Sequence, residues 1–231
     1  MREERLSVIV PTLNEAAGIV AFLEPLQRLR ERGVEVILAD GGSRDGTAAA
    51  ASPLVDRILL SPPGRALQMN AGAAVAAGDV LLFLHADTCL PDQAERLILE
   101  GLADKHRRWG RFDVRLSGAA SLLRIVEWTM NRRSRLTGIA TGDQGLFVER
   151  RLFEEVGGFP PIALMEDVAL SATLRRRGRP LCLEQTVAVS SRRWEKHGIW
   201  RTIALMWRLR LAYYLGAEPA RLAQIYYGRI Q

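Results

Sequence analysis

The stretch Leu6-Ser7-Val8-Ile9-Val10-Pro11-Thr12-Leu13-Asn14-Glu15 decides the fold, because an apolar run is followed at once by a polar cluster. The apolar run predicts a buried strand of a parallel sheet, and the polar residues lie where that strand ends. The same arrangement recurs at 34–47, 57–65 and 80–87. Ligands of open α/β sheets bind beyond the carboxyl ends of the strands. The four clusters therefore predict a binding site at that end of the sheet.

The segments between these strands have the composition of helices. Apolar residues keep helical spacing from Ile19 to Leu29, and Ala66–Ala77 is rich in small residues that let a helix pack close to a sheet. This alternation predicts an α/β fold with a mostly parallel sheet covered on both faces. Further on, Arg111–Ser117 alternates apolar and charged residues, which is typical of an edge strand. Helices are expected at 119–135, 166–177 and 199–215, and a further strand at 181–189.

The composition is that of an ordinary globular protein. The chain has 231 residues, of which 48% are hydrophobic and 25% charged, and this suits one large domain with a substantial core. Two cysteines without paired spacing predict neither a disulfide framework nor a zinc cluster. No segment has the pattern of a signal peptide or of a membrane-spanning helix. We therefore expect a cytoplasmic protein.

The net charge of +6 is concentrated near the C-terminus. Residues 171–231 hold 12 Lys and Arg against 3 Asp and Glu, whereas residues 1–170 hold 20 against 23. A basic third fits an anionic partner such as a diphosphate or a lipid surface, and a solvated Arg-rich face is an equally good interpretation. Since only 6% of residues are aromatic and no nucleic-acid motif occurs, no nucleic-acid partner is expected.

Two of the clusters carry groups that suit a nucleotide. Asp40 is followed by Gly41 and Gly42, which let the backbone approach a ligand, so its carboxylate can accept a hydrogen bond from a base or ribose. An Asx turn is the structural alternative. Arg65 precedes a helix, where its charge and the helix N-terminus both favour phosphate. A surface arginine without a ligand is the alternative for Arg65.

A third cluster, 85–87, suggests a divalent cation. Asp87 lies two residues after His85, and on an extended segment both side chains project to the same side. They can bind an ion whose coordination is completed by diphosphate oxygens and water. A buried core histidine is an equally good interpretation of His85. Because we expect their strands to be neighbours, Asp40 and Asp87 are predicted to face one crevice.

The adjacent acids Glu166 and Asp167 open the helix that follows Pro160 and Pro161. Acidic residues in a first helical turn are common caps, and that is the structural alternative here. Two adjacent carboxylates cannot both point to one place, however. One can fix the loop or meet a phosphate-bound partner, while the other meets a substrate hydroxyl as a general base.

The clusters belong to an ordered series of motifs that covers most of the chain from Leu6 to Trp194. The series is VPTLNE (10–15), DGGSRDGT (40–47), GRALQMNAG (64–72), HADT (85–88), GDQGLFV (142–148), VGGF (156–159), ED (166–167) and RRW (192–194). It resembles the GT-A fold glycosyltransferases of the large inverting family 2, which includes many bacterial polysaccharide and lipid-sugar transferases. The compact length and the GDQG segment are similar to a small bacterial subgroup associated with arsenosugar biosynthesis.

The resemblance implies one domain over 1–231, with a nucleotide-sugar-binding half at 1–110 and a smaller, mixed acceptor and catalytic-base half at 111–231. Asp167 matches the catalytic base. Asp87 matches the second carboxylate of the family's Asp-X-Asp metal motif, with His85 in place of the first, and His197 is a looser match to a late metal ligand. The sugar or acceptor would contact Gly142, Asp143, Gln144 and Glu166. The nucleotide sugar would contact Pro11, Asn14, Glu15, Asp40, Gly42, Arg65, His85, Ala86, Asp87 and a closing loop of Arg192, Arg193 and Trp194.

The reaction that the resemblance implies is a single in-line displacement with inversion. Asp167 removes a proton from the acceptor hydroxyl, whose oxygen attacks the anomeric carbon. Mg²⁺ or Mn²⁺, with help from arginines, stabilises the departing nucleoside diphosphate. The implied partners are a nucleoside diphosphate sugar of UDP or GDP type and an acceptor that carries a hydroxyl.

Other classes of nucleotide-binding enzyme fit the sequence less well. A dehydrogenase or a P-loop enzyme would need a glycine-rich turn after the first strand, where Pro-Thr-Leu-Asn-Glu stands instead. A sugar nucleotidyltransferase is the alternative enzyme. It would want a glycine-rich loop with a lysine there, and Lys105 and Lys196 are the only lysines of the chain.

The alternative that is not an enzyme is a binding module on a membrane surface. The helix at 199–215 has Trp200 and Trp207 on an apolar side, with Arg201, Arg208 and Arg210 nearby, as interfacial helices do. Amphipathic helices more often pack such a side on the core. We therefore expect core packing first, and peripheral contact with the inner membrane face through 199–215 as the alternative.

Overall fold

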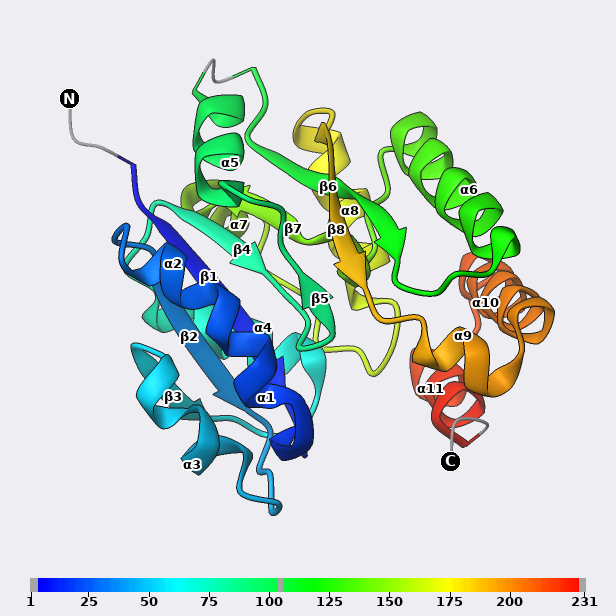
Figure 1. The fold of residues 1–231 in the computed structure, drawn as a ribbon. Helices are drawn as coiled ribbons and strands as arrows, with labels where there is room; N and C mark the ends of the chain where they lie inside the picture. The colour runs from blue at the N-terminus through cyan, green and yellow to red at the C-terminus, as the bar shows by residue number, and fades with distance from the viewer. Residues whose placement is uncertain (1–3, 104–105, 229–231) are drawn as a thin grey trace.

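The computed structural model describes residues 4–103 and 106–228. An eight-stranded sheet runs through these residues in the order β3-β2-β1-β4-β7-β6-β8-β5 (Figure 1). The strands are β1 (Leu6–Thr12), β2 (Glu35–Asp40), β3 (Arg57–Leu60), β4 (Val80–Phe83), β5 (Thr88–Cys89), β6 (Trp109–Leu116), β7 (Leu146–Glu149) and β8 (Leu181–Val189).

The first four strands pair in parallel, with β1 between β2 and β4. The prediction that the strands before Asp40 and Asp87 are neighbours is therefore wrong, because β1 separates them. The reason is topological: the chain adds β2 and β3 on one side of β1 and then crosses over to add β4 on the other. The crossover makes the carboxyl ends of β1 and β4 the point where strand order reverses, and ligands of open sheets bind there.

Beyond β4 the sheet is mixed. Strand β7 is antiparallel to β4 and β6, β6 is parallel to β8, and β8 is antiparallel to β5. The prediction of an edge strand at 111–117 is wrong, since β6 lies between β7 and β8. Its charged residue Arg111 is fully buried and donates hydrogen bonds to Asp113 and to the carbonyl of Asn131. The predicted α/β class is confirmed, and the boundary expected after residue 110 falls inside β6.

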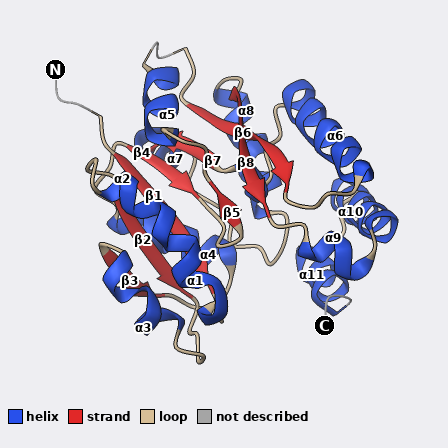
Figure 2. Ribbon diagram, in the orientation of Figure 1, coloured by secondary structure: helices blue, strands red, loops and turns tan. Residues whose placement is uncertain are grey.

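Helices cover both faces of the sheet (Figure 2). None of the helices in the described residues combines the length and the apolar character needed to cross a bilayer. The helices are α1 (Ala16–Leu23), α2 (Gln27–Arg30), α3 (Thr47–Ala51), α4 (Arg65–Val75), α5 (Ala94–Leu102), α6 (Ser121–Thr137), α7 (Arg150–Glu155), α8 (Glu166–Arg177), α9 (Arg192–His197), α10 (Ile199–Tyr214) and α11 (Pro219–Gly228).

Each face of the sheet has its own core because successive strand residues point to opposite sides. Val8 and Val10 of β1 pack with helices α1, α5 and α6, whereas Ile9 packs with α4, α7 and α8. Helix α4 lies close to the sheet, as its small residues predict. A methyl group added at Gly72 would lie 2.4 Å from Cγ2 of Ile9.

A third cluster of buried side chains joins the C-terminal helices to the start of α8, and we call it the C-terminal cluster. Its members are Ile139, Leu164, Met165, Val168, Leu209, Leu222, Ala223 and Tyr226. In α10 the buried side of the helix carries Leu209, which is 1% exposed, while Trp200 and Trp207 are 70% and 73% exposed. The expectation that these two tryptophans pack on the core is therefore wrong.

Candidate functional site

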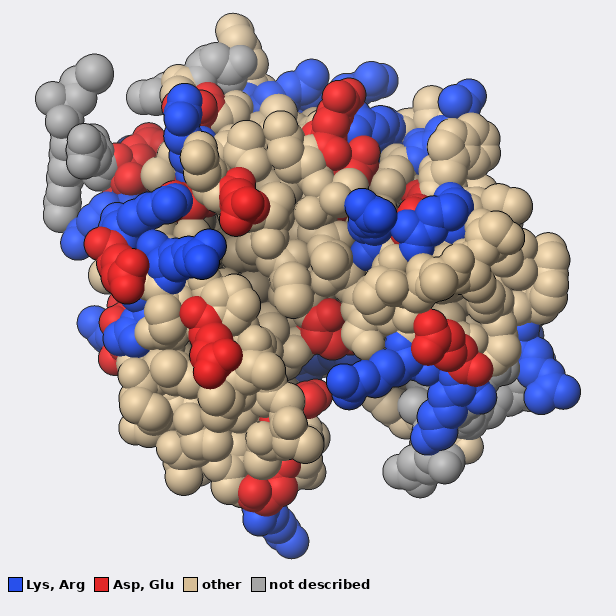
Figure 3. Space-filling view, in the orientation of Figure 1, with Lys and Arg blue, Asp and Glu red and all other residues tan. Residues whose placement is uncertain are grey.

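Two adjoining cavities lie beyond the carboxyl ends of β1 and β4. The larger cavity has a volume of about 750 Å³ and the smaller one about 110 Å³, and Arg65 and His85 border both. In Figure 3 this side of the molecule is hollowed between the part with β1–β3 and the part with α9–α11, with basic side chains on the rim. Among the residues that line the larger cavity are Pro11, Glu15, Arg65, His85, Ala86, Asp87, Ala223 and Tyr227. Among those of the smaller one are Gly142, Asp143, Glu166, Asp167, Met206, Arg210 and Tyr226.

The loops after β1 and β2 are joined by hydrogen bonds between backbone and side chains. The Asn14 N–H donates to Oγ of Ser43 (2.8 Å), and the Arg44 N–H donates to Oδ1 of Asn14 (3.0 Å). The Glu15 N–H donates to Oγ1 of Thr47 (2.8 Å). Asn14 has φ of 56°, a left-handed conformation that asparagine tolerates. Asn14 thus builds the loop, whereas the side chain of Glu15 borders the larger cavity.

The predicted base-binding residue Asp40 lies in an Asx turn. Its carboxylate accepts hydrogen bonds from the N–H groups of Gly42 (3.2 Å) and Ser43 (2.9 Å) and from the Ser43 hydroxyl. It is 4% exposed, and neither Asp40 nor Gly42 is among the residues that line the two cavities. Among the described residues, these contacts are those of the Asx turn that was the structural alternative for Asp40. Its contact with a base stays a prediction.

A buried glutamine that sequence reasoning missed holds the floor of the larger cavity. Nε2 of Gln68 donates to the carbonyls of Thr12 (2.7 Å) and Ala39 (2.8 Å), which ties α4 to the ends of β1 and β2. The available signal was a glutamine on the sheet-facing side of a helix otherwise rich in small residues. Its two bonds give the strand ends a fixed separation where a ligand would bind.

Charges of both signs meet at the larger cavity. Burial raises the pKa of Glu15, the carboxylates of Asp87 and Asp45 raise it further, and Arg65 and Arg192 oppose that rise. For Arg65, burial lowers the pKa, but Tyr227 and three carboxylates, those of Glu166, Asp167 and Asp87, outweigh it and the net shift is upward. The wall between the two cavities therefore carries the positive charge of Arg65, with acidic side chains around it.

The segment 85–87 forms a turn, closed by a hydrogen bond from the Thr88 N–H to the carbonyl of His85 (3.0 Å). The expectation that this segment is extended is therefore wrong. Both residues still line the larger cavity. The His85 ring also packs against Gly142, where an added methyl group would lie 2.4 Å from Cε1.

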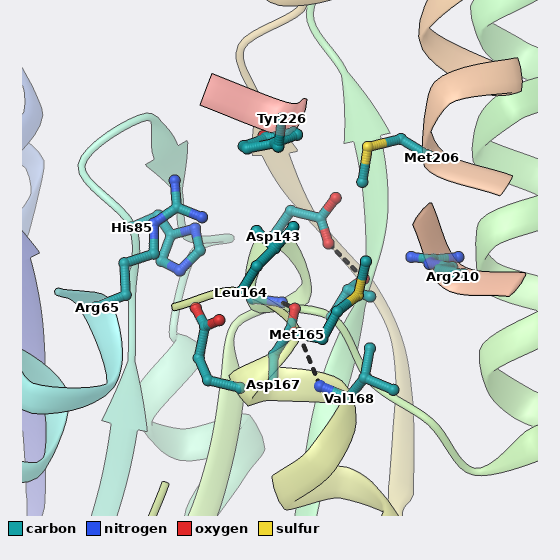
Figure 4. A pocket seen from close by; sticks show the side chains of 13 residues that line it. Arg65, His85, Asp143, Leu164, Met165, Asp167, Val168, Met206, Arg210 and Tyr226 are labelled. Atoms are coloured by element: carbon teal, nitrogen blue, oxygen red, sulfur yellow. Dashed lines mark hydrogen bonds between the residues drawn. The ribbon is translucent and has the colours of Figure 1, made fainter. Parts of the chain in front are cut away.

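Asp167 lies on the wall of the smaller cavity, half-buried. Its Oδ2 accepts the Gly142 N–H and its Oδ1 the Val168 N–H, both at 2.7 Å (Figure 4). Each oxygen keeps lone-pair capacity for another donor. Two backbone donors therefore orient the carboxylate without closing it to a ligand.

Glu166 is 5% exposed, and burial followed by repulsion from Asp167 raises its pKa to about 7, against a lowering by Arg65. Met165, directly before it, has φ of 70° and is 5% exposed. The backbone thus turns through a left-handed residue to present two acids in succession. One of them holds its proton to near neutral pH, and the other meets the backbone donors of the smaller cavity.

The turn at Gly142–Gln144 is stabilised by a capping box with Thr141. The Thr141 N–H donates to Oε1 of Gln144 (3.1 Å), and Gln144 is fully buried. Gly142 and Asp143 line the smaller cavity, as does Glu166, so three of the four predicted acceptor residues lie together there. Gln144 instead holds the turn.

The predicted closing loop at 192–194 is helix α9. Arg192 is exposed and lies close enough to Glu15 to lower the pKa of that carboxyl. Trp194 packs against the core beside the sheet. The loop assignment is therefore wrong in the described residues. The side chains of Arg193 and His197 lie outside the described part of the chain.

The C-terminal helices supply cavity residues that sequence reasoning missed. Met206 and Arg210 of α10 line the smaller cavity with Tyr226 of α11, and Tyr227 lines the larger one. Figure 4 shows Arg65 and His85 on one side of Asp167, and Met206 and Arg210 on the other. The basic and aromatic composition of α10 was visible, but spacing alone did not show that one side of it faces a site.

The fold matches solved glycosyltransferase structures. The mannosyltransferase PcManGT from Pyrobaculum calidifontis, in complex with GDP-Man and Mn²⁺, aligns with a TM-score of 0.64 and 23% identity over 93% of this chain and 63% of its own. TarS of S. aureus (residues 1–349), in complex with UDP-GlcNAc, aligns with a TM-score of 0.66 and 17% identity over 81% of this chain and 59% of its own. These similarities confirm the GT-A type of fold.

Curated relatives match the N-terminal part. A PGL/p-HBAD biosynthesis glycosyltransferase of Mycobacterium bovis is 37% identical over 97 residues, 39% of this chain and 38% of the relative. A glycosyltransferase of Haemophilus influenzae that is described as uncharacterized is 34% identical over 97 residues, 40% of this chain and 33% of the relative. The matches thus span little more than a third of these relatives. Residues 7–149 match the family description Glycosyl transferase family 2, and the chain belongs to that family.

Proposed function

We propose that the protein transfers a sugar from a nucleoside diphosphate sugar of UDP or GDP type to an acceptor hydroxyl, with inversion and with Asp167 as the general base. The observation that carries the proposal is the position of Asp167, whose oriented carboxylate lines a small cavity that adjoins a larger one at the strand switch point. Family membership favours glycosyl transfer over nucleotidyl transfer.

The two cavities suit the two substrates. The larger one has the volume and the polar loops for a nucleotide. Arg65, on the wall common to both, would contact a diphosphate while the sugar points toward Asp167. An acceptor in the smaller cavity would then present its hydroxyl to the carboxylate from the side opposite the leaving group, and such an in-line attack inverts the configuration.

A divalent cation fits this site as a companion of the diphosphate. No group of three or more His, Cys, Asp and Glu is placed to hold a metal within the described part of the chain. Mg²⁺ and Mn²⁺ commonly need only one or two carboxylates besides substrate phosphates. Asp87, with Glu15 beside it, would hold such an ion. When bound, the ion would neutralise charge on the leaving diphosphate.

Replacement of Asp167 tests the proposal. Asp167→Asn keeps one of the two backbone hydrogen bonds through its amide oxygen, but its NH2 group cannot accept the other and the side chain cannot take a proton. We expect sugar transfer to fall by about 10²–10⁴-fold, while UDP or GDP binding with Mn²⁺, measured by calorimetry, is unchanged. Glu100→Gln, on the exposed side of α5, is the matched control for loss of a carboxylate and should keep full activity.

The donor and acceptor are found by screening nucleoside diphosphate sugars for release of nucleoside diphosphate. Normal turnover by Asp167→Asn would exclude it as the base. Failure of the wild-type chain to bind or cleave any such donor would favour the binding module over the enzyme. The similarity to the subgroup associated with arsenosugar biosynthesis stays a prediction, because none of the relatives described above carries that name.

We also propose that α6 and α10 contact a membrane surface. Large apolar side chains are exposed on both helices beside arginines of the same helices, which is the composition of interfacial helices. The exposed side chains are Ile125, Trp128 and Leu136 on α6 and Trp200, Trp207, Leu211 and Tyr214 on α10. The exposed arginines are Arg132, Arg201 and Arg208. The occupant we assign is an anionic lipid bilayer, since the basic charge complements it.

Flotation with liposomes tests the membrane contact. Phosphatidylglycerol liposomes should carry the wild-type protein, and phosphatidylcholine liposomes should carry much less of it. Trp200→Ala with Trp207→Ala should lower the floated fraction severalfold, while donor cleavage in solution is unchanged. Leu60→Ala, an exposed apolar residue on β3, is the control. Equal flotation of the double variant would contradict the assignment.

A further inference from the structure

Two arginines near Asp167 have no role in the proposed transfer. Arg133 lies on α6 and Arg210 on α10. Nε and Nη2 of Arg133 and Nε of Arg210 are closed off from solvent and have no hydrogen-bond partner among the described residues. Among the described residues, the guanidinium group of Arg133 makes a single hydrogen bond, a 3.4 Å contact from Nη1 to the carbonyl of Ile139. Buried donors of this kind are costly unless a partner meets them.

The two guanidinium groups are close enough to repel each other. Burial lowers the pKa of Arg133 to about 10, Arg210 lowers it too, and Asp143, Asp167 and Tyr214 oppose the fall. None of the salt bridges found in the described residues includes either arginine. The two cations lie on different helices, repel each other and have guanidinium N–H groups without a partner among the described residues. A bound anion would stabilise this arrangement.

The position of this pair relates it to the acceptor rather than to the donor. Arg210 lines the smaller cavity with Asp167, and it is not among the residues that line the larger one. Arg65 stands on the opposite side of Asp167 (Figure 4). A donor diphosphate at Arg65 would therefore be separated from Arg210 by the base. An acceptor whose hydroxyl meets Asp167 would meet Arg210 on the cavity wall, with Arg133 close to both.

We propose that Arg133 and Arg210 form a subsite for a phosphate group of the acceptor, so that the acceptor carries a phosphate ester near the hydroxyl that receives the sugar. Two arginines on separate helices approach a ligand from different directions. A phosphate is favoured over a carboxylate because phosphate oxygens accept hydrogen bonds from several directions, whereas the two oxygens of a carboxylate accept fewer. The inference rests on the proposed function, since the hydroxyl is placed by Asp167.

Binding of glycerol 3-phosphate, measured by calorimetry, tests the subsite. We expect the wild-type protein to bind glycerol 3-phosphate and not glycerol. Arg133→Gln and Arg210→Gln should each weaken that binding about tenfold or more. The controls are Arg176→Gln and Arg177→Gln, which remove exposed arginines of α8 and should change the affinity less than about twofold.

The melting temperature of the ligand-free variants separates a subsite from a structural role. If the arginines only hold the helices, both Gln variants melt lower and bind glycerol 3-phosphate as the wild type does, and the proposal is overturned. If they form the subsite, the ligand-free variants melt at the same temperature or higher. Should a Gln variant fail to fold, the corresponding Lys variant keeps the charge and loses the guanidinium fork, and weaker binding is again expected.

Two further measurements complete the design. Dihexanoyl phosphatidylglycerol, dispersed as monomers, replaces glycerol 3-phosphate as the probe. Tighter binding of the lipid assigns a lipid headgroup, tighter binding of glycerol 3-phosphate assigns a small phosphate ester, and binding of neither by the wild type overturns the proposal. UDP and GDP binding with Mn²⁺ is measured in the same variants. Its absence in the wild type contradicts the proposed function, whereas its presence with unaltered glycerol 3-phosphate binding in both Gln variants contradicts the subsite alone.

Discussion

At the scale of single residues, the two adjacent acids at the start of α8 have different surroundings and therefore different chemistry. Asp167 meets two backbone donors at the cavity wall, whereas Glu166 is almost fully buried beside that charge. Burial, followed by repulsion from the Asp167 carboxylate, raises the pKa of Glu166 to about 7. The pair thus supplies one oriented carboxylate and one group that changes charge near neutral pH.

The pKa of Glu166 leads to a pH dependence of stability. The native group releases its proton at about pH 7, against the ordinary value of 4.5 in the unfolded chain. Between these values the native state binds more protons than the unfolded chain, so the free energy of unfolding falls as pH rises. The fall is complete above about pH 7 and amounts to at most about 3 kcal/mol. Glu166→Gln should remove this decline and have a larger free energy of unfolding than the wild type at pH 8. Denaturant unfolding from pH 5 to pH 8 measures it.

Glu154→Gln is the control for this measurement, because Glu154 is exposed. It should reproduce the wild-type decline between pH 5 and pH 8. Glu15, whose pKa is also raised, contributes in the same direction, so the comparison is the difference between variants at each pH. An unchanged slope in Glu166→Gln would show that the acid is not buried in its neutral form.

Positions beside a cavity could be predicted from the sequence for some of the motif residues, although their roles stay proposals. Asp167 was such a case, since it lies on the wall of the smaller cavity. Asp40 was not, since the same Gly-Gly-Ser segment that favours a ligand also supplies the donors of an Asx turn. Local pattern does not distinguish these two partners of a carboxylate. Arg133 and Arg210 were missed because only the packing of α6 near α10 brings them together.

At the scale of secondary-structure elements, the site depends on contact between the turn 85–87 and the turn 142–144. The Gly142 N–H holds Asp167, and the His85 ring occupies the space where a side chain at position 142 would lie. Because Gly142 has no Cβ, the turn 142–144 can donate to Asp167 while the adjacent turn 85–87 lines the larger cavity.

Gly142→Ala should displace the His85 ring, since the added carbon would lie 2.4 Å from Cε1 and 2.6 Å from Nε2. We expect a loss of about 1–3 kcal/mol in the free energy of unfolding together with weaker UDP or GDP binding. Chemical denaturation and calorimetry measure the two effects. Gly18→Ala is the control, because nothing lies within 4 Å of its added methyl group. It lies in α1 and should gain about 0.5–1 kcal/mol.

Most elements could be located from the sequence, because apolar runs and helical spacing are local properties. The strands at 57–60 and 181–189 and the helix at 166–177 have the expected bounds. The order of the strands could not be read in the same way. Strand β6 pairs with β8 about seventy residues later, and such long-range pairing buried Arg111 in what had the pattern of an edge strand.

At the scale of the whole molecule, the C-terminal cluster connects the last two helices to the segment that presents the acids. Leu222 of α11 is 2% exposed in this cluster, and Tyr226 and Tyr227 of the same helix line the two cavities. The basic C-terminal third thus closes the site that the N-terminal strands begin.

Leu222→Ala should cost about 2–5 kcal/mol through the cavity that it leaves. Because the cluster is separate from the cores on the two faces of the sheet, we expect faster amide exchange in α10 and α11, with protection in β1 and β4 kept. Hydrogen exchange read by mass spectrometry measures this, and donor binding should weaken in parallel. Leu222→Met is the control, with a cost below about 1.5 kcal/mol. Uniformly faster exchange would contradict a separate cluster.

The left-handed backbone at Met165 has a consequence for the order in which the parts of the site form. A methionine at φ of 70° is unfavourable by about 1–2 kcal/mol, and its side chain is held by a cluster that contains Leu209, Leu222 and Tyr226. Those residues follow α8 in the sequence, so they are synthesised after the acids that they help to position. We therefore expect a nascent chain that ends before α10 to form its first parallel strands while the acids of α8 still lack the orientation described here.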